Sequence, residues 1–392
     1  MNYILFDSEV RNHLLPFTFT RPVCDIRIGI LTIREKWEKR LKAKTSTLTE
    51  DHLSGKYPAS FGPSNIFING SVCPTDQLVK EVRSLKPGQA LMSGNTLLAA
   101  GTGSDKSLFS PNLPGTNPFK LLQTSSNFLE VSRLWNIYML NDRAIREDFT
   151  LLTKGRKSKP LSKTNKVLGA KNVFVEAGVK AECCIINATT GPVYLGKDSE
   201  LMEGSVIRGP FSLGEHSTLK ISTKIYGPTT IGPHCKVGGE VNNSVIFGYS
   251  NKAHDGFLGN SVIGEWVNIG ADSNNSNLKN NYAEVKLWSY AEEKFLNTGT
   301  IFCGLMMGDH SKCGINTMFN TGTVVGVSAN IFGSGFPRNF IPSFSWGGAA
   351  GFTTFRLKDA YEVAERVMER RNLKLSEEDK AILKYLFDLA NK

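Results

Sequence analysis

Aliphatic residues recur at every sixth position through the second half of the chain. From residue 195 the series is unbroken: Leu195, Leu201, Ile207, Leu213, Leu219, Ile225, Ile231 and Val237. The same period occurs upstream at Val167, Val173, Val179 and Ile185. After a slip in phase it resumes at Val245, Phe257, Ile263 and Ile269, with Asn251 as an exception, and a last set runs Ile301, Met307, Cys313, Phe319, Val325 and Ile331. This period matches neither an α-helix nor the simple alternation of a strand.

Six residues accommodate one short strand and one tight corner. Three faces then make a triangular coil of about eighteen residues, whose inward side chains stack on those of the next coil. Glycine often follows the inward residue, as in Leu213-Gly214 and Ile231-Gly232. We expect it there because glycine enters turn conformations without a Cβ penalty. The pattern predicts a parallel β-helix over residues 167–340, with about seven or eight coils in 167–269 and 301–333.

The remaining segments have different patterns. Residues 1–153 alternate strand signals at 3–6 and 66–68 with helix signals at 29–44, 75–84 and 134–148, which is typical of an α/β layer. A basic Ser- and Pro-containing linker is predicted at 154–166. An Asn-rich insertion at 271–300 interrupts the repeat, and a tail at 341–392 contains two amphipathic helices, 356–371 and 376–390, that could cap the solenoid.

Composition narrows the class of protein. The chain has 392 residues with a net charge of +10, and no run of eighteen apolar residues, so we expect no membrane span. The basic residues are dispersed and no nucleic-acid-binding motif occurs, which favours phosphorylated small molecules as partners over nucleic acid. The apolar N-terminus indicates a buried strand rather than a signal peptide. Seven cysteines without metal-ligand spacing indicate a reducing cytoplasm.

One stretch within the repeat carries a specific resemblance. Residues 251–271 read NKAHDGFLGNSVIGEWVNIGA and are followed by the Asn-rich segment. This order resembles the acetyltransferase coil of bifunctional N-acetylglucosamine-1-phosphate uridyltransferases, in a variant resembling those of bacteroidetes, and belongs to the hexapeptide-repeat acyltransferase pattern. The resemblance implies a left-handed β-helix, acetyl-CoA as acyl donor, and a homotrimer with sites between neighbouring subunits.

His254 is the candidate general base. N-acetylation requires a neutral amine, and an imidazole with a pKa of about 6.5 can accept the amine proton near neutral pH. Alternation along a strand points Asp255 to the opposite face, so we do not pair it with His254. The other histidines lack this context: His13, His52, His216, His234 and His310.

Further site residues follow from the resemblance alone. It implies that Asn268 lies near the sugar and that Asn277 or Asn281, with Tyr282 and Lys286, contacts substrate. The family's arginine and lysine for the sugar phosphate have no clear equivalents, and Phe257 replaces a frequent tyrosine. Arg208, Lys224 and Lys252 are therefore the candidates to supply the missing charge.

The resemblance also implies a shortened, Rossmann-like nucleotidyltransferase domain at the N-terminus. The family's Gly-rich phosphate loop is absent, because residues 14–23 read LLPFTFTRPV. Backbone N–H groups around two prolines cannot cradle phosphates as glycines do. Arg21 and Arg34, with Arg27, would then bind the triphosphate by charge, with Mg²⁺ bridging phosphate oxygens. The alternative is a degenerate domain kept for structure or regulation.

Three functions remain open from the sequence. The first is acetyl transfer from acetyl-CoA to an amino-sugar 1-phosphate, coupled to nucleotidyl transfer that makes a UDP-sugar. The second is a trimeric scaffold or sugar-nucleotide sensor with a degenerate site, or a nucleotidyltransferase for another sugar 1-phosphate. The third is a carbonic-anhydrase-like metalloenzyme using His234 and His254, although no metal site is assigned.

Overall fold

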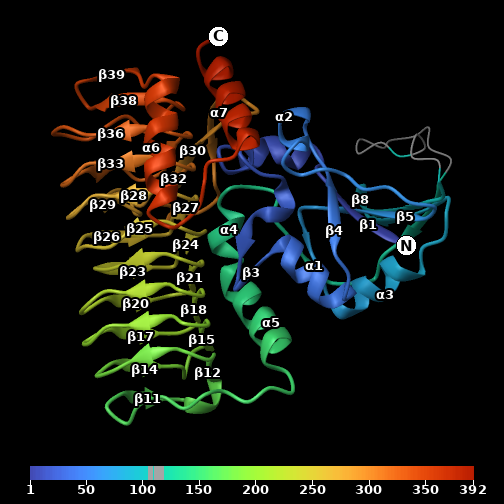
Figure 1. The fold of residues 1–392 in the computed structure, drawn as a ribbon, viewed down its shortest axis with the longest axis horizontal. Coiled ribbons are helices and arrows are strands. Elements are labelled where there is room, and N and C mark those ends of the chain that lie inside the picture. Colours follow the sequence, from blue (N-terminus) through green and yellow to red (C-terminus); the bar gives the residue numbers. More distant parts are fainter. Residues whose placement is uncertain (105–108, 110–118) are drawn as a thin grey trace. The chain divides into compact units, whose positions relative to one another are not determined.

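The computed structural model describes residues 1–104, 109 and 119–392 (Figure 1). By contacts between residues they form two compact units. Unit 1 contains residues 1–26, 31–133 and 377–382, and unit 2 contains residues 27–30, 134–376 and 383–392. The helical segment that begins at residue 134 therefore groups with the repeat region rather than with the N-terminal α/β layer. Each unit is considered separately below.

Unit 1 is built on a mixed six-stranded sheet. Its strand order is β4 (Thr45–Leu48), β1 (Asn2–Phe6), β5 (Asn65–Asn69), β8 (Thr96–Thr102), β7 (Gln89–Ser93) and β9 (Lys120–Gln123). Strand β1 is parallel to both of its neighbours, whereas β8 is antiparallel to both of its own. The predicted strands at 3–6 and 66–68 are confirmed, and the α/β class of this region with them.

The helices of unit 1 are short. They are α1 (Ile33–Leu41), α2 (Asp51–Ser54) and α3 (Asp76–Ser84), and a small sheet pairs β6 (Val72–Cys73) with β10 (Leu129–Glu130). Helix α1 is shorter than the 29–44 expected. It begins after Thr32, whose side chain accepts a hydrogen bond from the Glu35 amide in a capping box, and it ends at Lys42 in a left-handed conformation. Strand β3 (Leu31–Thr32) takes the preceding residues.

Unit 2 is a parallel β-solenoid with three sheets, which we call sheets I, II and III. Sheet I contains β11 (Lys166–Leu168), β14 (Ile185–Asn187), β17 (Val206–Arg208), β20 (Lys224–Tyr226), β23 (Glu240–Asn242) and β26 (Phe257–Gly259). Sheet II contains β12 (Val173–Val175), β15 (Val193–Leu195), β18 (Phe211–Leu213), β21 (Thr229–Ile231), β24 (Val245–Ile246), β27 (Val262–Ile263), β32 (Leu305–Met307), β35 (Thr323–Val325) and β37 (Phe340–Ile341). Sheet III contains β13 (Lys180–Ala181), β16 (Glu200–Leu201), β19 (Thr218–Leu219), β22 (Lys236–Val237), β25 (Asn251–Lys252), β28 (Asn268–Ile269), β33 (Lys312–Cys313), β36 (Asn330–Ile331), β38 (Ser345–Gly348) and β39 (Gly351–Thr354).

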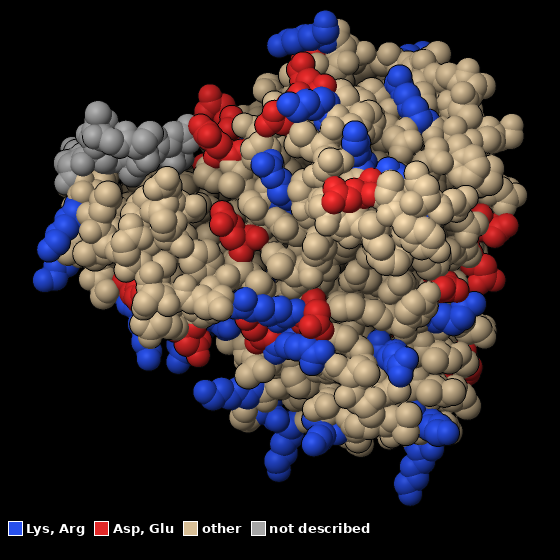
Figure 2. Space-filling model, turned by 180° about the vertical axis from the view of Figure 1, so that it is seen from behind, with Lys and Arg blue, Asp and Glu red and all other residues tan. Residues whose placement is uncertain are grey.

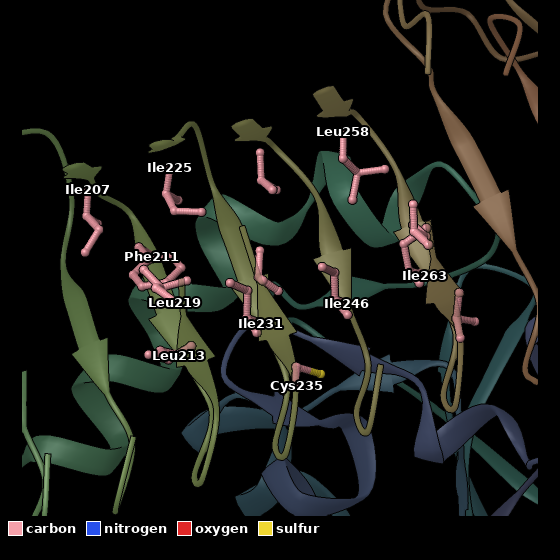
Figure 3. Packing of buried hydrophobic residues seen from close by; sticks show 14 of the residues in the cluster. Ile207, Phe211, Leu213, Leu219, Ile225, Ile231, Cys235, Ile246, Leu258 and Ile263 are labelled. Atoms are coloured by element: carbon pink, nitrogen blue, oxygen red, sulfur yellow. The ribbon is translucent and has the colours of Figure 1, made fainter. Parts of the chain in front are cut away.

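The predicted inward column is present. All eight members of the series from Leu195 to Val237 are at most 2% exposed and belong to one continuous apolar cluster. Figure 3 shows such side chains stacked from coil to coil, with Ile207, Ile225 and Leu258 on one face and Ile231, Ile246 and Ile263 on another. The parallel β-helix is confirmed, with nine successive strands in sheet II rather than seven or eight.

Four predicted inward positions are wrong. At Val245 the inward residue is Ile246, which pairs in register with Ile231. Ile185 is 41% exposed and Ile301 is 37% exposed, and the half-buried Phe257 yields the inward position to Leu258. Next to Ile185, Ile186 is the buried residue, because the register pairs it with Val167, which lies nineteen residues earlier. A coil longer than eighteen residues shifts the phase by one, and one residue is enough to turn a side chain to the other face.

Glycine after the inward residue has a different cause from the one expected. Gly232 does not adopt a positive φ, but a Cβ atom there would lie 1.2 Å from the carbonyl oxygen of Phe247 in the next coil. The left-handed corner positions are filled instead by residues such as His234 and Trp266. Glycine is therefore required by the close approach of stacked coils, not by the turn conformation.

The interruption of the repeat is shorter than expected. Strand β29 (Asn274–Asn275) already pairs in parallel with β34 (Met318–Phe319), so the coil continues past residue 271. The excursion that follows carries an antiparallel hairpin, β30 (Lys286–Ser289) and β31 (Lys294–Asn297). The Asn-rich stretch therefore begins inside the solenoid.

Unit 2 contains the helices α4 (Asn136–Met139), α5 (Asn141–Thr153) and α6 (Leu357–Glu369), and the part of α7 (Glu377–Ala390) from residue 383 onward. Helices α6 and α7 match the predicted C-terminal helices. Buried polar groups fix α5 to the solenoid. The fully buried Asn141 donates to the carbonyl of Pro228 and accepts from the Thr230 hydroxyl. The Asn141 side-chain oxygen also accepts a hydrogen bond from the backbone N–H of Gly29, the residue that follows β2 (Arg27–Ile28). These bonds position α5 on sheet II.

Adjacent isoleucines test the register. Ile186→Ala should lower the free energy of unfolding by about 2–5 kcal/mol, because it leaves a cavity in the inward column. Ile185→Ala should change it by no more than about 0.5 kcal/mol, since that side chain faces solvent. Denaturant unfolding of both variants provides the measurement. Equal effects at the two positions would contradict the register.

Candidate functional site

His254 lies at an exposed corner of the solenoid, between β25 on sheet III and β26 on sheet I. Asp255 beside it is also exposed. Gly256 has a φ of +114°, and a Cβ atom there would lie 2.2 Å from the carbonyl oxygen of Ser273 in the next coil. The backbone conformation of the corner is therefore tightly restricted, and the His254 side chain is exposed on its outer side. The described residues form no hydrogen bond to the His254 ring.

Lys252 has a different role from the one expected. Its register partner is Val237, so its side chain points into the solenoid and the residue is only 2% exposed. The ammonium donates to the carbonyl oxygens of His254 and Asp255, the latter at 3.2 Å. Burial lowers the pKa of Lys252 to about 8. A lysine in this position fastens the backbone of the His254 corner from inside and does not reach a substrate on the surface.

The first asparagines of the Asn-rich stretch are used structurally. Asn274 Oδ1 accepts from the Phe257 amide at 2.7 Å, and Asn275 Oδ1 accepts from the Gly259 amide at 2.9 Å. Asn277 Nδ2 donates to Asn260 Oδ1 at 2.7 Å. These bonds replace missing strand pairing along β26, the strand that follows the His254 corner. The stretch therefore stiffens one side of that corner.

The rest of the expected substrate loop is open to solvent. Asn281 accepts from the Ala283 amide in a local turn, and Tyr282 is 67% exposed in a left-handed conformation. Lys286 is exposed at the start of β30. Within the part of the chain that the structure describes, none of these three forms a hydrogen bond to the His254 corner. Their substrate contacts stay a prediction.

The charged candidates on sheet I do not gather near His254. Arg208 ends β17 and Lys224 begins β20, and both are exposed. Three strand spacings separate β17 from β26, or roughly 14 Å along the stack. Asn268, by contrast, is exposed on β28 and pairs in register with Asn251, three residues before His254. Of the predicted polar contacts, Asn268 is therefore placed on the strand beside the one leading to His254.

A cleft beside this corner was not foreseen from the sequence. It has a volume of about 430 Å³ and lies between sheet III and the end of α6. Its lining residues are Lys236, Tyr249, Asn251, Ala253, Trp266, Val267, Asn268, Lys312, Val367, Arg370 and Arg371. Burial lowers the pKa of Lys312 to about 8. No sequence signal joined α6 to the sheet residues, although the Arg370-Arg371 pair is visible as a basic helix end.

A ladder of rings borders the cleft. His216, His234, Tyr249, Trp266 and His310 occupy equivalent left-handed corners between sheets II and III. Neighbouring rings stack with centroid separations of 5.0, 4.7, 4.3 and 6.3 Å. His234 is thus held between two aromatic neighbours at a different corner from His254. Within residues 1–104, 109 and 119–392, no group of three His, Cys, Asp or Glu side chains is arranged to hold a metal ion.

In unit 1 the predicted arginines differ in their surroundings. Arg34 forms a two-pronged ion pair with Asp25, at 2.6 and 3.0 Å, and its guanidinium also reaches Thr47. Arg21 is 4% exposed, and its carbonyl accepts from Arg11. Arg34 would have to exchange a carboxylate for a phosphate to bind a nucleotide. The segment that precedes Arg21 contains the short 3₁₀ turns Glu9–Leu14 and Phe17–Phe19 in place of a Gly-rich loop.

Surface charge and hydropathy add two observations. On the face drawn in Figure 2, lysine and arginine side chains stand singly among uncharged surface, with acidic side chains between them. No helix in the described part of the chain combines the length and the apolar character needed to cross a membrane.

Comparison with known proteins adds the family context. Residues 3–157 match the family model for sugar nucleotidyl transferases. A bifunctional sugar-1-phosphate nucleotidylyltransferase/acetyltransferase of Sulfurisphaera tokodaii is 30% identical over 215 residues, which are 54% of this chain and 47% of that protein. The chain thus matches about half the length of this curated relative. At the level of the family, the resemblance inferred from the sequence is confirmed.

Two solved structures are also similar over part of the chain. The UDP-N-acetylglucosamine acyltransferase of Arabidopsis is 18% identical, covering 56% of this chain and 79% of its own, with a TM-score of 0.25. A variant of the N-acyltransferase AntD from Bacillus cereus, in complex with dTDP and coenzyme A, is 10% identical, covering 54% and 88%, with a TM-score of 0.22. At these TM-scores neither structure bears on the function of this chain.

The buried lysine makes a prediction about pH. Because the folded pKa of Lys252 is about 8 and the ordinary value is 10.5, the unfolded chain holds more protons between these values. Stability contributed by this group therefore rises with pH. From pH 7.5 to 10 the free energy of unfolding of the wild type should rise by about 2 kcal/mol relative to Lys252→Met. Urea unfolding of both proteins across this range is the measurement, and parallel pH profiles would show that Lys252 is not buried as a cation.

Proposed function

We propose that the solenoid unit transfers an acetyl group from acetyl-CoA to the amine of an amino-sugar 1-phosphate similar to glucosamine 1-phosphate. The observation that carries this proposal is the His254 corner. Its imidazole is exposed, while its backbone is fixed from inside by Lys252. A general base must be accessible to the substrate and held in position. This corner combines an exposed side chain with a fixed backbone.

The chemistry needs one proton acceptor and a leaving thiolate. The amine nitrogen attacks the thioester carbonyl, so that a nitrogen–carbon bond forms and the carbon–sulfur bond breaks. His254 accepts the proton that the amine loses and returns it to the departing sulfur of CoA. Asn268, Asn277, Asn281, Tyr282 and Lys286 are proposed to contact the substrates around it.

The active form is proposed to be a cytoplasmic homotrimer with each site shared between neighbouring solenoids. The exposed ring of His254 has no orienting partner among the described residues of one chain, and a general base is normally oriented by a third group. A neighbouring copy is the proposed source. The seven cysteines are all free, which suits a reducing compartment.

For the N-terminal unit we propose nucleotidyl transfer to a sugar 1-phosphate, forming a UDP-sugar. A phosphate oxygen of the sugar phosphate would attack the α-phosphorus of the nucleoside triphosphate and release pyrophosphate. Arg21 and Arg34 would neutralise part of the charge of the triphosphate, and a Mg²⁺ ion, when bound with the nucleotide, would offset more of it. The family match over residues 3–157 supports this part of the proposal. Nucleotidyl transfer would then either consume the product of acetyl transfer or supply its substrate.

His254→Ala tests the acetyl transfer. We expect kcat to fall by about 10² to 10⁴ with acetyl-CoA and glucosamine 1-phosphate, the usual contribution of a positioned base. Affinity for CoA should change little, because the imidazole acts on the amine. Thiol release across pH at saturating substrates is the measurement. The exposed His216→Ala serves as the matched control, and a folded His254→Ala protein retaining more than half of the wild-type rate would remove His254 from the mechanism.

Arg21→Ala tests the nucleotidyl transfer separately. Pyrophosphate release from UTP and a sugar 1-phosphate should be lost, because the variant lacks a cation for the triphosphate. Acetyl transfer by the same preparation should be unchanged, and an unaltered melting temperature would show that the buried position tolerates the change. Absence of pyrophosphate release by the wild type with any nucleoside triphosphate would overturn this assignment.

A further inference from the structure

We propose that the cleft between sheet III and the end of α6 is the subsite that binds the phosphate of the acceptor sugar, using Lys236, Lys312, Arg370 and Arg371. This inference rests on the proposed acetyl transfer and deepens it. It replaces Arg208, Lys224 and Lys252, the cations that the sequence suggested for the role.

The cleft has an unbalanced charge. Its four ionisable cations come from two strands of sheet III and from the end of α6, and no carboxylate is among its lining residues. Within the described residues, none of the four has a carboxylate within 4 Å. Lys312 donates to the carbonyl of His310 at 2.8 Å, and Arg371 donates to Asn251 Oδ1 at 3.2 Å. Lys312 and Arg371 are partly removed from water and bonded to neutral oxygens, whereas Lys236 and Arg370 are exposed, and the first pair in particular favours an anionic ligand.

A simpler explanation accounts for only half of the charge. Arginines at the end of a helix stabilise its macrodipole, and Arg370 and Arg371 follow the last residue of α6 directly. Lys236 and Lys312 lie on β22 and β33 and have no such role. Burial also lowers the pKa of Lys312 to about 8, because it disfavours the charged form of the amine. A bound anion would stabilise that charged form.

The cleft reaches the residue next to the proposed base. Ala253, which precedes His254, lines it, and so does Asn268, the residue already expected near the sugar. In a 2-amino sugar 1-phosphate the amine and the phosphate are on neighbouring ring carbons. A phosphate in the cleft therefore leaves the amine close to the His254 corner. Tyr249 and Trp266 add an aromatic wall on which a sugar ring can pack.

The guanidinium of Arg371 suits a phosphate in particular. Among the residues that the structure describes, Asn251 is its one hydrogen-bond acceptor, so the other N–H donors of the planar guanidinium are available for two phosphate oxygens. Lys236 is exposed, pairs in register with Asn251, and adds a flexible point charge to the cleft. The combination of guanidinium and ammonium groups matches a dianionic phosphate monoester.

Binding measurements on the full-length protein test the subsite. Arg371→Gln should weaken binding of glucosamine 1-phosphate by about tenfold or more, since a charge-assisted hydrogen bond is lost. Binding of unphosphorylated glucosamine should not change. Arg366→Gln is the matched control, because Arg366 lies on the same helix, is exposed and pairs with Glu362. Lys236→Gln, at an exposed position, provides a second variant that preserves packing.

Titration calorimetry separates this inference from the proposed function. His254→Ala should bind glucosamine 1-phosphate as the wild type does, and lose only acetyl transfer. If the wild type transfers no acetyl group but Arg371→Gln and Lys236→Gln still lose affinity for glucosamine 1-phosphate, the subsite stands and the reaction is a different one. If both variants bind it as tightly as the Arg366→Gln control, the subsite is overturned, whether or not acetyl transfer occurs.

Discussion

The structure depends on the stacking of successive coils in register. Each coil lies about 4.8 Å above the last, so every inward side chain must fill the space over its predecessor and every corner must admit the next backbone. Gly232 shows how tight this is, since a Cβ atom there would collide with Phe247. A change in one coil is therefore transmitted directly to its neighbours. This constraint makes the solenoid a rigid frame for side chains at its corners.

Lys252 is the informative exception to the inward column. A lysine replaces an aliphatic residue above Val237, and its desolvation is offset by the carbonyl oxygens of the corner that carries His254. The same corner is held from the following coil by Asn274 and Asn275. A buried polar group is thus located where the backbone departs from regular pairing. The proposed catalytic residue is exposed, but the chain beneath it is fixed by a buried network.

The cleft at α6 gathers positive charge in a different part of the fold from the one that the sequence suggested. The cations expected on sheet I are absent from the surroundings of His254, whereas four others converge from sheet III and the C-terminal helix. An anionic substrate requires positive charge at a place in space, and no particular strand has to provide it. In unit 1, Arg34 is already paired with Asp25, so the same requirement would be met there only by exchange of partners.

The sequence alone determined the features that repeat locally or recur in a motif. A six-residue period fixes a stacked solenoid, because each coil repeats the same packing, and the stretch around His254 identifies its candidate base. The tertiary structure decided what depends on register and on distant segments. Ile186 rather than Ile185 points inward, because an elongated coil shifts the phase by one residue. Lys252 points inward because of its place above Val237. Arg371 and Lys236 line the same cleft because the end of α6 lies against sheet III. No periodicity in the sequence links positions so far apart in the chain.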